Sequence, residues 1–504
     1  MFNYQDIISF FKKKFNRKDL LLIVFLTFLY LVSRIVNLDK FPIFTDEGIY
    51  IHWAKIAWHD ASWRFISLTD GKQPLQTWAT IPFLKLFPGN ALLAGRLFSV
   101  GAGFAALAGV FSLLYYLFGK KAAFLGSFFY IITPYFLFYD RLALTDSAVN
   151  ATSIWVLFFS ILMIKTLRLD IALLFGLLGG MTLLTKSPTK MFLLLSLLSP
   201  IILIGSSGLK KNLLKSINYL ILFVVVGFLS LVIYNVQRLS PFLHYVAEKN
   251  TTFVMTFSEF IKAPFSIVAG NIKIVPWYIF WEAGWLIPIL GIIGLFSLYK
   301  KNRGLAIYFF LWLLLPFLAI CFFSKVVFPR YLIFFASLLL ILASYQLKQL
   351  PKKILLVIFV LLTVFLLYLN YPIIFNFKSI SFPPVDRGQY IEGPPAGWGT
   401  KEIIDYTRNK SIIKPVIILA EGNFGLIADM LDVFIKKDDR IEIRGYWPLE
   451  EKNLVENQKE LEQKYVYVVF PHRDQFPQNW PIRLIKRFDK PTNKSAIYFF
   501  ELQK

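Results

Sequence analysis

The chain alternates long apolar runs with short polar connections. Eleven runs are apolar enough, and most of them long enough, to cross a bilayer as helices of about 20 residues. They cover residues 20–37, 92–118, 122–139, 148–165, 171–184, 191–206, 217–236, 284–299, 305–323, 331–347 and 354–371. This pattern predicts an all-α multi-span membrane domain over residues 1–371. The runs at 171–184 and 191–206 are short, so we expect these helices to be tilted or covered by neighbours.

The charges of the polar connections predict on which side of the membrane each connection lies. If the N-terminal segment with Lys12, Lys13 and Lys14 is cytoplasmic, alternation places every basic loop on the cytoplasmic side, as the positive-inside rule requires. These loops hold Lys120, Lys121, Arg168, Lys210, Lys211, Lys215, Lys300, Lys301, Arg303 and the lysines of 348–353. The same register predicts a plasma-membrane protein with an extracytoplasmic C-terminus.

Two long connections fall on the outer side. The first, residues 38–90, carries Trp53, Trp58, Trp63 and Trp78 and predicts a helix lying at the membrane surface. The second, residues 237–283, is predicted to form a lid, another interfacial helix or a plain connecting loop.

The pattern changes after Tyr371. A Pro- and Gly-rich stretch is followed by short strand-like runs that alternate with helical patterns. The strands are predicted at 416–420, 441–446, 465–470 and 496–502, and the helices at 424–436 and 449–464. The pattern predicts an extracytoplasmic α/β domain over residues 372–504. No Gly-x-Gly-x-x-Gly or Walker signature marks it, so no nucleotide site is predicted.

Composition agrees with a membrane protein and narrows the partners. Hydrophobic residues make up 57% of the chain and charged residues 17%, and the mean hydropathy is +0.59. The net charge of +23 would suit nucleic acid. The lysines and arginines lie mostly in short loops, however, where topology and anionic lipid account for them, so no nucleic-acid partner is predicted. The single cysteine, Cys321, excludes an intramolecular disulfide and a thiolate metal cluster.

The candidate chemistry begins with two adjacent carboxylates, Asp46 and Glu47, directly after the first apolar run. Charges at a bilayer boundary are costly to keep there unless they serve a function. Partial desolvation suits Asp46 as a general base toward an acceptor hydroxyl, with Glu47 beside it. The alternative is that Thr45 or Asp46 caps the helix that follows.

Cations on the predicted outer side break the positive-inside trend and indicate a bound anion. The candidates are Lys72, in a Gly- and Pro-shaped turn, Arg141, Lys186 with Lys190 nearby, and Arg330 at the start of a late run. Asp146 begins another run and is either a site residue or a helix cap. We expect Arg96, inside the second span, to be a structural partner for a buried carboxylate or carbonyl.

No metal site is predicted, because the four histidines are isolated in the sequence. The alternative is a divalent cation shared by Glu47 and His52.

The order of these motifs resembles the polyprenyl-phosphate-dependent glycosyltransferases of the GT-C superfamily. The resemblance rests on the acidic pair, the Lys-x-Pro-Leu turn from Lys72, the Asp-Arg-x-x-x-x-Asp connection of 140–146 and the late Arg330-Tyr331. More narrowly, the chain looks like the protein O-mannosyltransferase and aminoarabinose-transferase branch, over residues 15–350. In one departure, Gln73 stands in the Lys-x-Pro turn where the family often has a second proline. The C-terminal domain resembles no known acceptor-binding module.

The resemblance implies site roles and a reaction. Asp46 would be the base with Glu47 as its neighbour, Asp146 would shape the pocket, and Lys72 and Arg330 would hold the lipid-linked phosphate. Lys186 and Arg141 are further phosphate-binding candidates. The implied reaction is an inverting transfer of a hexose or pentose from a polyprenyl-phosphate donor to a lipid, glycan or protein acceptor outside the membrane, with no cofactor.

Two other functions fit the composition less well. A ligase that uses a polyprenyl-diphosphate glycan would be expected to have more basic residues on the outer side and no acidic pair. A lipid or glycan transporter would place its charges at mid-bilayer and unwound Gly/Pro segments in matching halves. Here the strongest charges lie at the ends of the apolar runs.

Overall fold

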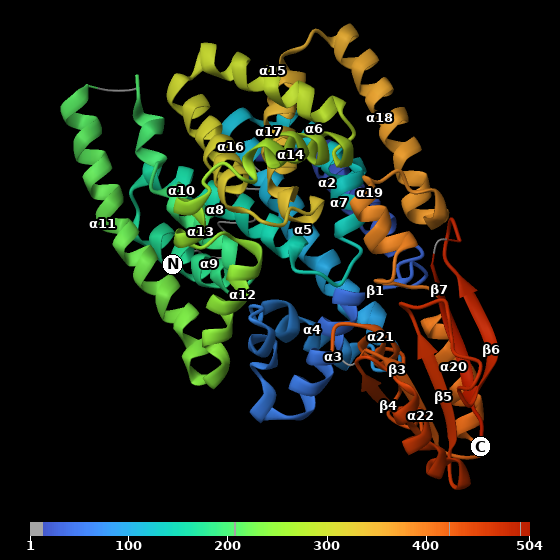
Figure 1. Ribbon diagram of the computed structural model, residues 1–504. Coiled ribbons are helices and arrows are strands. Elements are labelled where there is room, and N and C mark those ends of the chain that lie inside the picture. Colours follow the sequence, from blue (N-terminus) through green and yellow to red (C-terminus); the bar gives the residue numbers. More distant parts are fainter. Residues whose placement is uncertain (1–13, 206–207, 423, 494) are drawn as a thin grey trace.

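A helical body and a smaller sheet-containing domain make up the molecule (Figure 1). The computed structural model describes residues 14–205, 208–422, 424–493 and 495–504. Lys12 and Lys13, which belong to the predicted basic N-terminal segment, lie outside the described residues.

Each of the eleven predicted runs falls on one or more helices of the body. These are α2 (Arg17–Ile35), α5 (Ala91–Phe118), α6 (Lys120–Ile132) with α7 (Pro134–Tyr139), α8 (Asp146–Thr166), α9 (Leu169–Leu183), α10 (Lys190–Ser196) with η4 (Ser199–Leu203), α11 (Leu209–Tyr234), α15 (Leu286–Lys301), α16 (Arg303–Phe323), α17 (Ile333–Gln349) and α18 (Lys352–Phe375). Within the described ranges, six helices are by themselves long and apolar enough to cross a membrane, and a bent pair makes a seventh. The chain is therefore a multi-pass membrane protein, while the number of eleven crossings stays a prediction.

Several of the helices are short or broken for identifiable reasons. Pro134 cannot continue α6 and starts α7. α14 (Val268–Glu282) meets α15 at an angle of 108°. Gly284 and Trp285, both with positive φ, form that corner. The short run at 171–184 forms the short helix α9, and the run at 191–206 is split between α10 and η4, while their tilt in the membrane stays a prediction.

The two connections that were predicted to lie on the outer side are mostly helical. The first contains α3 (Thr45–His59), the 3₁₀ turns η1 (Ala61–Trp63) and η2 (Ile66–Asp70), and α4 (Leu75–Leu86). The second contains η5 (Asn235–Leu239), η6 (Pro241–His244), α12 (Tyr245–Phe253), α13 (Phe257–Lys262) and α14. The second connection is therefore not a plain loop.

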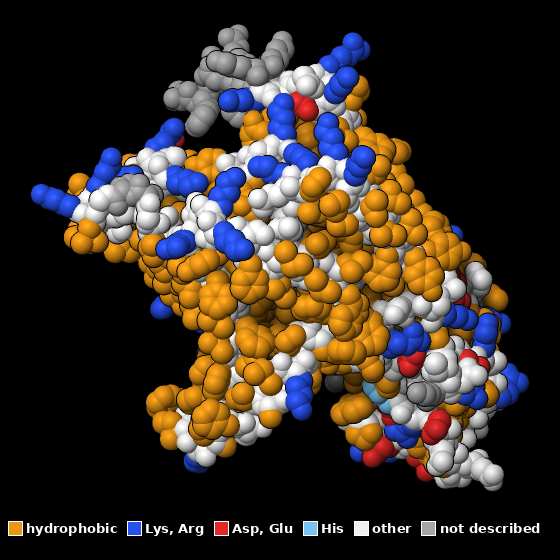
Figure 2. Space-filling model, turned by 90° about the horizontal axis from the view of Figure 1, so that it is seen from above, with side chains coloured by type: hydrophobic (Ala, Val, Ile, Leu, Met, Phe, Trp, Pro, Cys, Tyr) orange, Lys and Arg blue, Asp and Glu red, His pale blue; other side chains and the backbone are white. Residues whose placement is uncertain are grey.

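One end of the helical body is basic. It holds the connections between α10 and α11, α15 and α16, and α17 and α18 (Figure 1). Figure 2 looks onto this end and shows Lys and Arg side chains gathered over it, whereas acidic side chains are seen mainly on the C-terminal domain. This is the distribution of charge from which the cytoplasmic side was predicted.

The C-terminal domain contains a five-stranded sheet of order β4-β3-β5-β7-β6. β3 (Val416–Glu421) pairs in parallel with β4 (Ile441–Tyr446) and with β5 (Tyr465–Phe470). β7 (Ala496–Leu502) runs antiparallel to both of its neighbours, β5 and β6 (Ile482–Asp489). The helices are α20 (Thr400–Ser411), α21 (Ile427–Asp432) and α22 (Glu451–Gln458) with η10 (Lys459–Glu462). The four predicted strands are confirmed, whereas β6 and α20 were not predicted.

The segment between the two parts returns to the helical body. It contains η8 (Phe377–Ser379), α19 (Pro384–Arg387), the π-helical turn η9 (Gly388–Glu392) and β2 (Ala396–Gly397). β2 pairs antiparallel with β1 (Ile43–Phe44), the strand directly before α3. Thr45 adds a backbone hydrogen bond of 3.1 Å to the Pro395 carbonyl. A segment distant in sequence is thereby fixed beside the start of α3.

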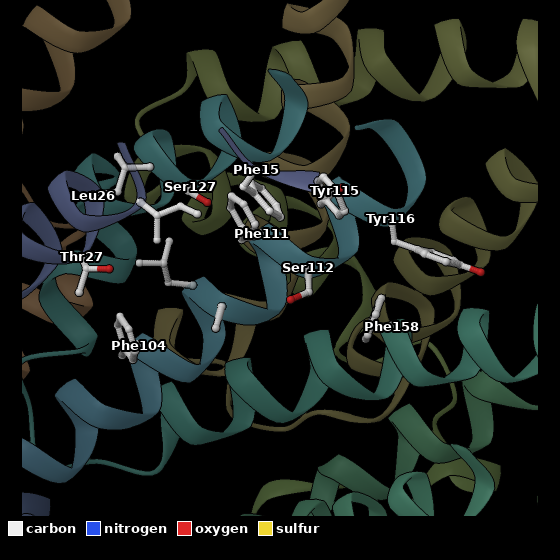
Figure 3. Close-up of a pocket in the computed structure, with 13 residues that line it drawn as sticks. Phe15, Leu26, Thr27, Phe104, Phe111, Ser112, Tyr115, Tyr116, Ser127 and Phe158 are labelled. Carbon is white, nitrogen blue, oxygen red and sulfur yellow. The ribbon is translucent and has the colours of Figure 1, made fainter. Parts of the chain in front are cut away.

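A cavity of about 440 Å³ opens among α2, α5, α6 and α8 (Figure 3). Its lining includes Phe15 and Leu26 from the first part of the chain and Phe111 and Tyr115 from the second half of α5. No charged side chain lines it within the described residues. It lies toward the ends of α2 and α5 that are remote from Asp46, so it offers no reactive group to the candidate site.

Candidate active site

The centre of the candidate site is the carboxylate of Asp46, which lies between two cations. Arg330 Nη2 is 3.1 Å from Asp46 Oδ2, and Lys72 Nζ is 3.5 Å from Asp46 Oδ1. Burial would raise the pKa of the Asp46 carboxyl, but the charges of Lys72, Arg330 and Lys186 outweigh burial and hold that pKa below its usual value. Asp46 is therefore ionised at neutral pH. The structure brings together three residues that lie far apart in the sequence.

The start of α3 separates the roles of the two adjacent carboxylates. Successive helical residues point about 100° apart, so Asp46 and Glu47 face different neighbours. Glu47, not Thr45 or Asp46, accepts the Phe44 N–H at 3.0 Å and caps the helix. The Asp46 side chain is left to face Lys72 and Arg330, and the capping alternative for Asp46 does not hold.

A tight turn and two aromatic rings position Lys72. The turn passes through Gly71, whose φ of 63° favours glycine. The Lys72 ammonium lies 5.1 Å from the ring centroid of Tyr50 and 5.5 Å from that of Trp53, within the range of cation–π attraction. Burial would lower the pKa of Lys72, but the negative charges of Asp46 and Asp70 raise it above the usual value.

Arg330 is held by groups that the sequence did not reveal as site residues. It lies in the 3₁₀ turn η7 (Pro329–Leu332), directly before α17. Its Nη1 donates hydrogen bonds to Gln389 Oε1 at 2.9 Å and to the Tyr390 hydroxyl at 3.1 Å. Both partners come from η9, in the segment that was predicted to belong to the C-terminal domain.

A second ion pair lies next to the first. Lys186 Nζ donates to Asp146 Oδ1 at 2.9 Å. Lys186 also lies 4.1 Å from the ring centroid of Tyr331, and the Arg330 guanidinium lies 5.4 Å from the same ring. Burial would lower the pKa of Lys186, but Asp146 raises it. Asp146 opens α8 without capping it, since its side chain is turned to Lys186.

Glu47 lies outside this cluster. Its side chain is fully buried and forms two hydrogen bonds of 2.8 Å with Arg96, one from Nε and one from Nη2. It also accepts the Ala143 N–H at 2.7 Å. The predicted structural role of Arg96 is confirmed. Because all of these donors are internal, the geometry makes Glu47 a support for the start of α3 and gives no evidence for a reacting group.

Arg141 is also directed away from the cluster. Its Nη1 donates hydrogen bonds of 2.9 Å to the carbonyls of Ser33, Arg34 and Val36 at the end of α2. Carbonyls at a helix C-terminus lack internal partners and attract cations. Arg141 therefore binds the C-terminal end of α2 and does not contact the residues around Asp46, where the phosphate site was predicted.

The alternative of a cation between Glu47 and His52 does not match the geometry. Glu47 pairs with Arg96, whereas His52 Nδ1 lies 2.8 Å from Asp432 of α21. In the part of the chain that the structure describes, no group of three or more His, Cys, Asp or Glu side chains is arranged to hold a metal ion.

The fold and the cluster together define a class. A carboxylate between two cations, at the end of a multi-span helical body that carries an appended α/β domain, is the arrangement expected from the resemblance to GT-C glycosyltransferases. Comparison with solved structures shows that the chain has this fold. The structure of ArnT from Cupriavidus metallidurans bound to undecaprenyl phosphate matches with a TM-score of 0.62, 13% identity and coverage of 95% of this chain and 97% of that chain.

Two further comparisons agree. The oligosaccharyltransferase AglB from Archaeoglobus fulgidus, in complex with an inhibitory peptide and a dolichol-phosphate, matches with a TM-score of 0.55, 12% identity and coverage of 91% of this chain and 70% of that chain. Residues 71–234 match the family of dolichyl-phosphate-mannose-protein mannosyltransferases. No curated protein sequence matches significantly. The resemblance to polyprenyl-phosphate-dependent glycosyltransferases of the GT-C superfamily is confirmed.

Proposed function

We propose that this protein is an integral membrane glycosyltransferase that moves a sugar from a polyprenyl-phosphate donor to an acceptor hydroxyl outside the cytoplasm, with inversion at the anomeric carbon. The observation that carries the proposal is the placement of Asp46 within 3.5 Å of Lys72 and 3.1 Å of Arg330. The fold shared with ArnT and AglB, and the family match over residues 71–234, support a lipid-linked donor.

The cluster can supply both charges that such a transfer needs. The acceptor oxygen attacks the anomeric carbon while the bond from that carbon to the phosphate oxygen breaks. Polyprenyl phosphate leaves with the bonding electron pair, and Lys72 and Arg330 stabilise the negative charge that grows on it. The proton of the acceptor hydroxyl passes to the Asp46 carboxylate.

Donor binding also changes Asp46 in this scheme. The Asp46 carboxylate pairs with both Lys72 and Arg330. Their positive charges keep Asp46 ionised and make it a weak base. A donor phosphate that takes over Lys72 and Arg330 withdraws their charge from Asp46. The pKa of Asp46 then rises toward a value better suited to a base.

The nearby pair of Lys186 and Asp146 has a supporting role in the proposal. Lys186 is a second cation for the donor phosphate, and Asp146 shapes the pocket for the acceptor or the sugar. The acceptor is a lipid, glycan or protein that reaches the outer side of the membrane.

The test is Asp46→Asn in purified, membrane-reconstituted protein, assayed with a panel of polyprenyl-phosphate sugars. We expect the turnover number to fall about 100-fold or more, because the amide cannot accept the proton. Asp60→Asn is a matched control, since Asp60 lies just past the other end of α3 and its capping bond to Ser62 survives the change. Transfer by Asp46→Asn at the wild-type rate would refute Asp46 as the base.

A second arm of the same assay tests the donor. Polyprenyl-diphosphate sugars are offered beside the monophosphates, and the anomeric configuration of the product is determined by NMR. Consumption of the diphosphate donors alone would favour a ligase, and retention of configuration would refute direct displacement.

A further inference from the structure

A second cavity, of about 360 Å³, lies at the corner between α14 and α15 and is separate from the cluster around Asp46. Its walls come from four parts of the chain: the corner itself, α18, the segment around η8 and Pro134 at the start of α7. The lining residues used below are Trp277, Trp281, Glu282, Trp285 and Phe382. A volume above about 300 Å³ is that of a small ligand site.

Glu282 is the exceptional group in this cavity. It is 2% exposed, and neither of its carboxyl oxygens accepts a hydrogen bond from any N–H or from any hydroxyl group of a described side chain. Its polar neighbour is the carboxyl of Asp386, also fully buried, whose Oδ2 accepts the Tyr139 hydroxyl. Burial raises the pKa of Asp386 to about 7. Two adjacent buried carboxyls without a cation are costly unless a proton or a bound cation neutralises them.

The neighbouring cations are already paired with other groups. Arg330 is engaged by Asp46, and by Gln389 and Tyr390. Arg387, next to Asp386 in the sequence, pairs with Glu392 at 2.5 Å. Glu282 and Asp386 lie within hydrogen-bonding reach of each other and can share one proton, which leaves one negative charge on the pair. The charge of Arg330 also acts on Asp386, but neither carboxyl forms an ion pair of its own with a described side chain.

Aromatic rings complete the site. The ring of Trp277 lies 5.0 Å from that of Trp281 at an interplanar angle of 75°, and 5.3 Å from that of Trp285 at 81°. Three tryptophans set edge to face present π-surfaces in different directions around one space. Aromatic faces beside a carboxylate are the chemistry that recognises an alkylammonium cation.

We propose that this cavity binds the ammonium headgroup of a membrane lipid, with Glu282 and Asp386 as the counter-charge and Trp277, Trp281 and Trp285 as the aromatic wall. The lipid origin follows from the position of the cavity mouth. Trp277 and Trp285 are 45% and 39% exposed, and the adjoining α18 exposes most of its apolar side chains. A headgroup carried by lipid reaches such a mouth along the membrane surface, where tryptophan is the favoured residue. The proposal does not depend on the glycosyltransferase activity.

The experiment is native mass spectrometry of the full chain, released from nanodiscs that hold equal amounts of phosphatidylethanolamine and phosphatidylglycerol with identical acyl chains. The first lipid carries a primary ammonium and the second does not. We expect the wild-type protein to retain phosphatidylethanolamine about tenfold over phosphatidylglycerol, a ratio within the range of a desolvated cation–π and ion-pair site. Glu282→Gln is expected to abolish the preference.

Two further variants and one competitor keep the test decisive. Glu259→Gln, at an exposed glutamate paired with Lys325 in the same outer connection, is the matched control and should keep the preference. Trp277→Leu leaves both carboxyls intact and should reduce the preference even if Glu282→Gln fails to fold. Equal retention of the two lipids by the wild type, or an unchanged preference in Glu282→Gln, would overturn the proposal. Displacement of phosphatidylethanolamine by an equal concentration of soluble ethanolamine would assign the site to a free amine and overturn the lipid origin.

Discussion

At the scale of single residues, Asp46 and Glu47 are adjacent in the sequence, but their side chains have different partners and different roles. Asp46 faces Lys72 and Arg330, and its side chain is 26% exposed. Glu47 is enclosed by Arg96 and two backbone N–H groups. A carboxylate whose partners are all internal contributes to folding, whereas one shared between cations at a partly open surface is available to a ligand.

We expect Glu47→Gln to destabilise the protein by about 3–5 kcal/mol, because it leaves the buried Arg96 guanidinium without a counter-charge. Thermal unfolding in detergent measures this effect. The double variant Glu47→Gln with Arg96→Met should recover part of the loss, since no unpaired charge then remains. A Glu47→Gln protein of wild-type stability but without transferase activity would instead support the predicted catalytic role.

The residues of the site were predictable only where their charges stood out in the sequence. Asp46, Lys72, Lys186 and Arg330 are charges in connections predicted to lie on the outer side, and the structure brings them together. Gln389 and Tyr390 are ordinary residues of a Pro- and Gly-rich connection. Their contact with Arg330 depends on the pairing of β1 with β2, which joins positions more than 350 residues apart and leaves no local signal.

At the scale of elements, the helix that carries Asp46 packs closely against the C-terminal domain. A Cβ at Gly48 of α3 would lie 3.0 Å from the backbone nitrogen of Met430 in α21. On the other side of the same contact, Lys55 Nζ lies 3.2 Å from Asp432 Oδ2. The two elements thus meet through backbone and paired charges.

Gly48→Ala is expected to lower the melting temperature and the transferase activity together, because the backbone of α21 must move to admit a methyl group. The gain in helix propensity, about 1 kcal/mol, acts in the opposite direction and should be outweighed. Gly101→Ala in α5 is the matched control, since no heavy atom lies within 4 Å of its added Cβ. A Gly48→Ala protein at least as stable as wild type would contradict this view of the contact.

The elements that the sequence missed have physical explanations. β6 has a bulge between Leu484 and Lys486, which breaks the two-residue alternation expected of a strand. α20 is polar along most of its length and buries a narrow stripe with Ile403 and Ile404. Most of the membrane helices were predictable because their apolar runs are long. The corner at Gly284 and Trp285 coincides with the predicted start of the run at 284–299, but the sequence before it did not reveal that α14 is a helix meeting α15 at an angle.

At the scale of the whole molecule, Asp386 links the segment before the C-terminal domain to the helical body, and its titration should be visible in the stability of the protein. Its pKa is raised to about 7 in the folded state, so between its ordinary value of 3.8 and 7 the folded protein holds a proton that the unfolded chain has released. Stability should therefore fall as the pH rises from about 4 to 7, by up to about 1.4 kcal/mol per unit.

Thermal unfolding at pH 5 and pH 8, in detergent without aminolipid, checks this expectation. Asp386→Asn should flatten the slope. The titration of His52, whose pKa is raised by Asp432 against the effect of burial, also lowers the stability of the protein as the pH rises, but His52 is present in both proteins and its effect cancels from their difference. Tyr139 and Arg330 face the same carboxyl and are common to both proteins, whereas Glu282 titrates together with Asp386, so the difference reports the titration of this carboxyl pair. Equal slopes for the two proteins would refute the titration.

The orientation of the molecule is open to a direct test. In a Cys321→Ala background, Lys301→Cys and Lys504→Cys are treated with a membrane-impermeant maleimide on intact cells. We expect labelling at position 504 without permeabilisation and at position 301 only after it, because Lys301 lies at the basic end. Labelling in the reverse order would invert the predicted topology and place the Asp46 cluster on the cytoplasmic side.

Because β1 pairs with β2, the candidate site can be completed only late in the synthesis of the chain. During synthesis the segments that carry Asp46, Lys72 and Arg330 are made before residues 389–397. Until then Arg330 lacks two of its hydrogen-bond partners, and β1, the strand before Asp46, lacks its partner strand β2. If the proposed transfer needs Arg330 in this position, a chain that ends before this stretch should insert into the membrane but consume no lipid-linked sugar donor.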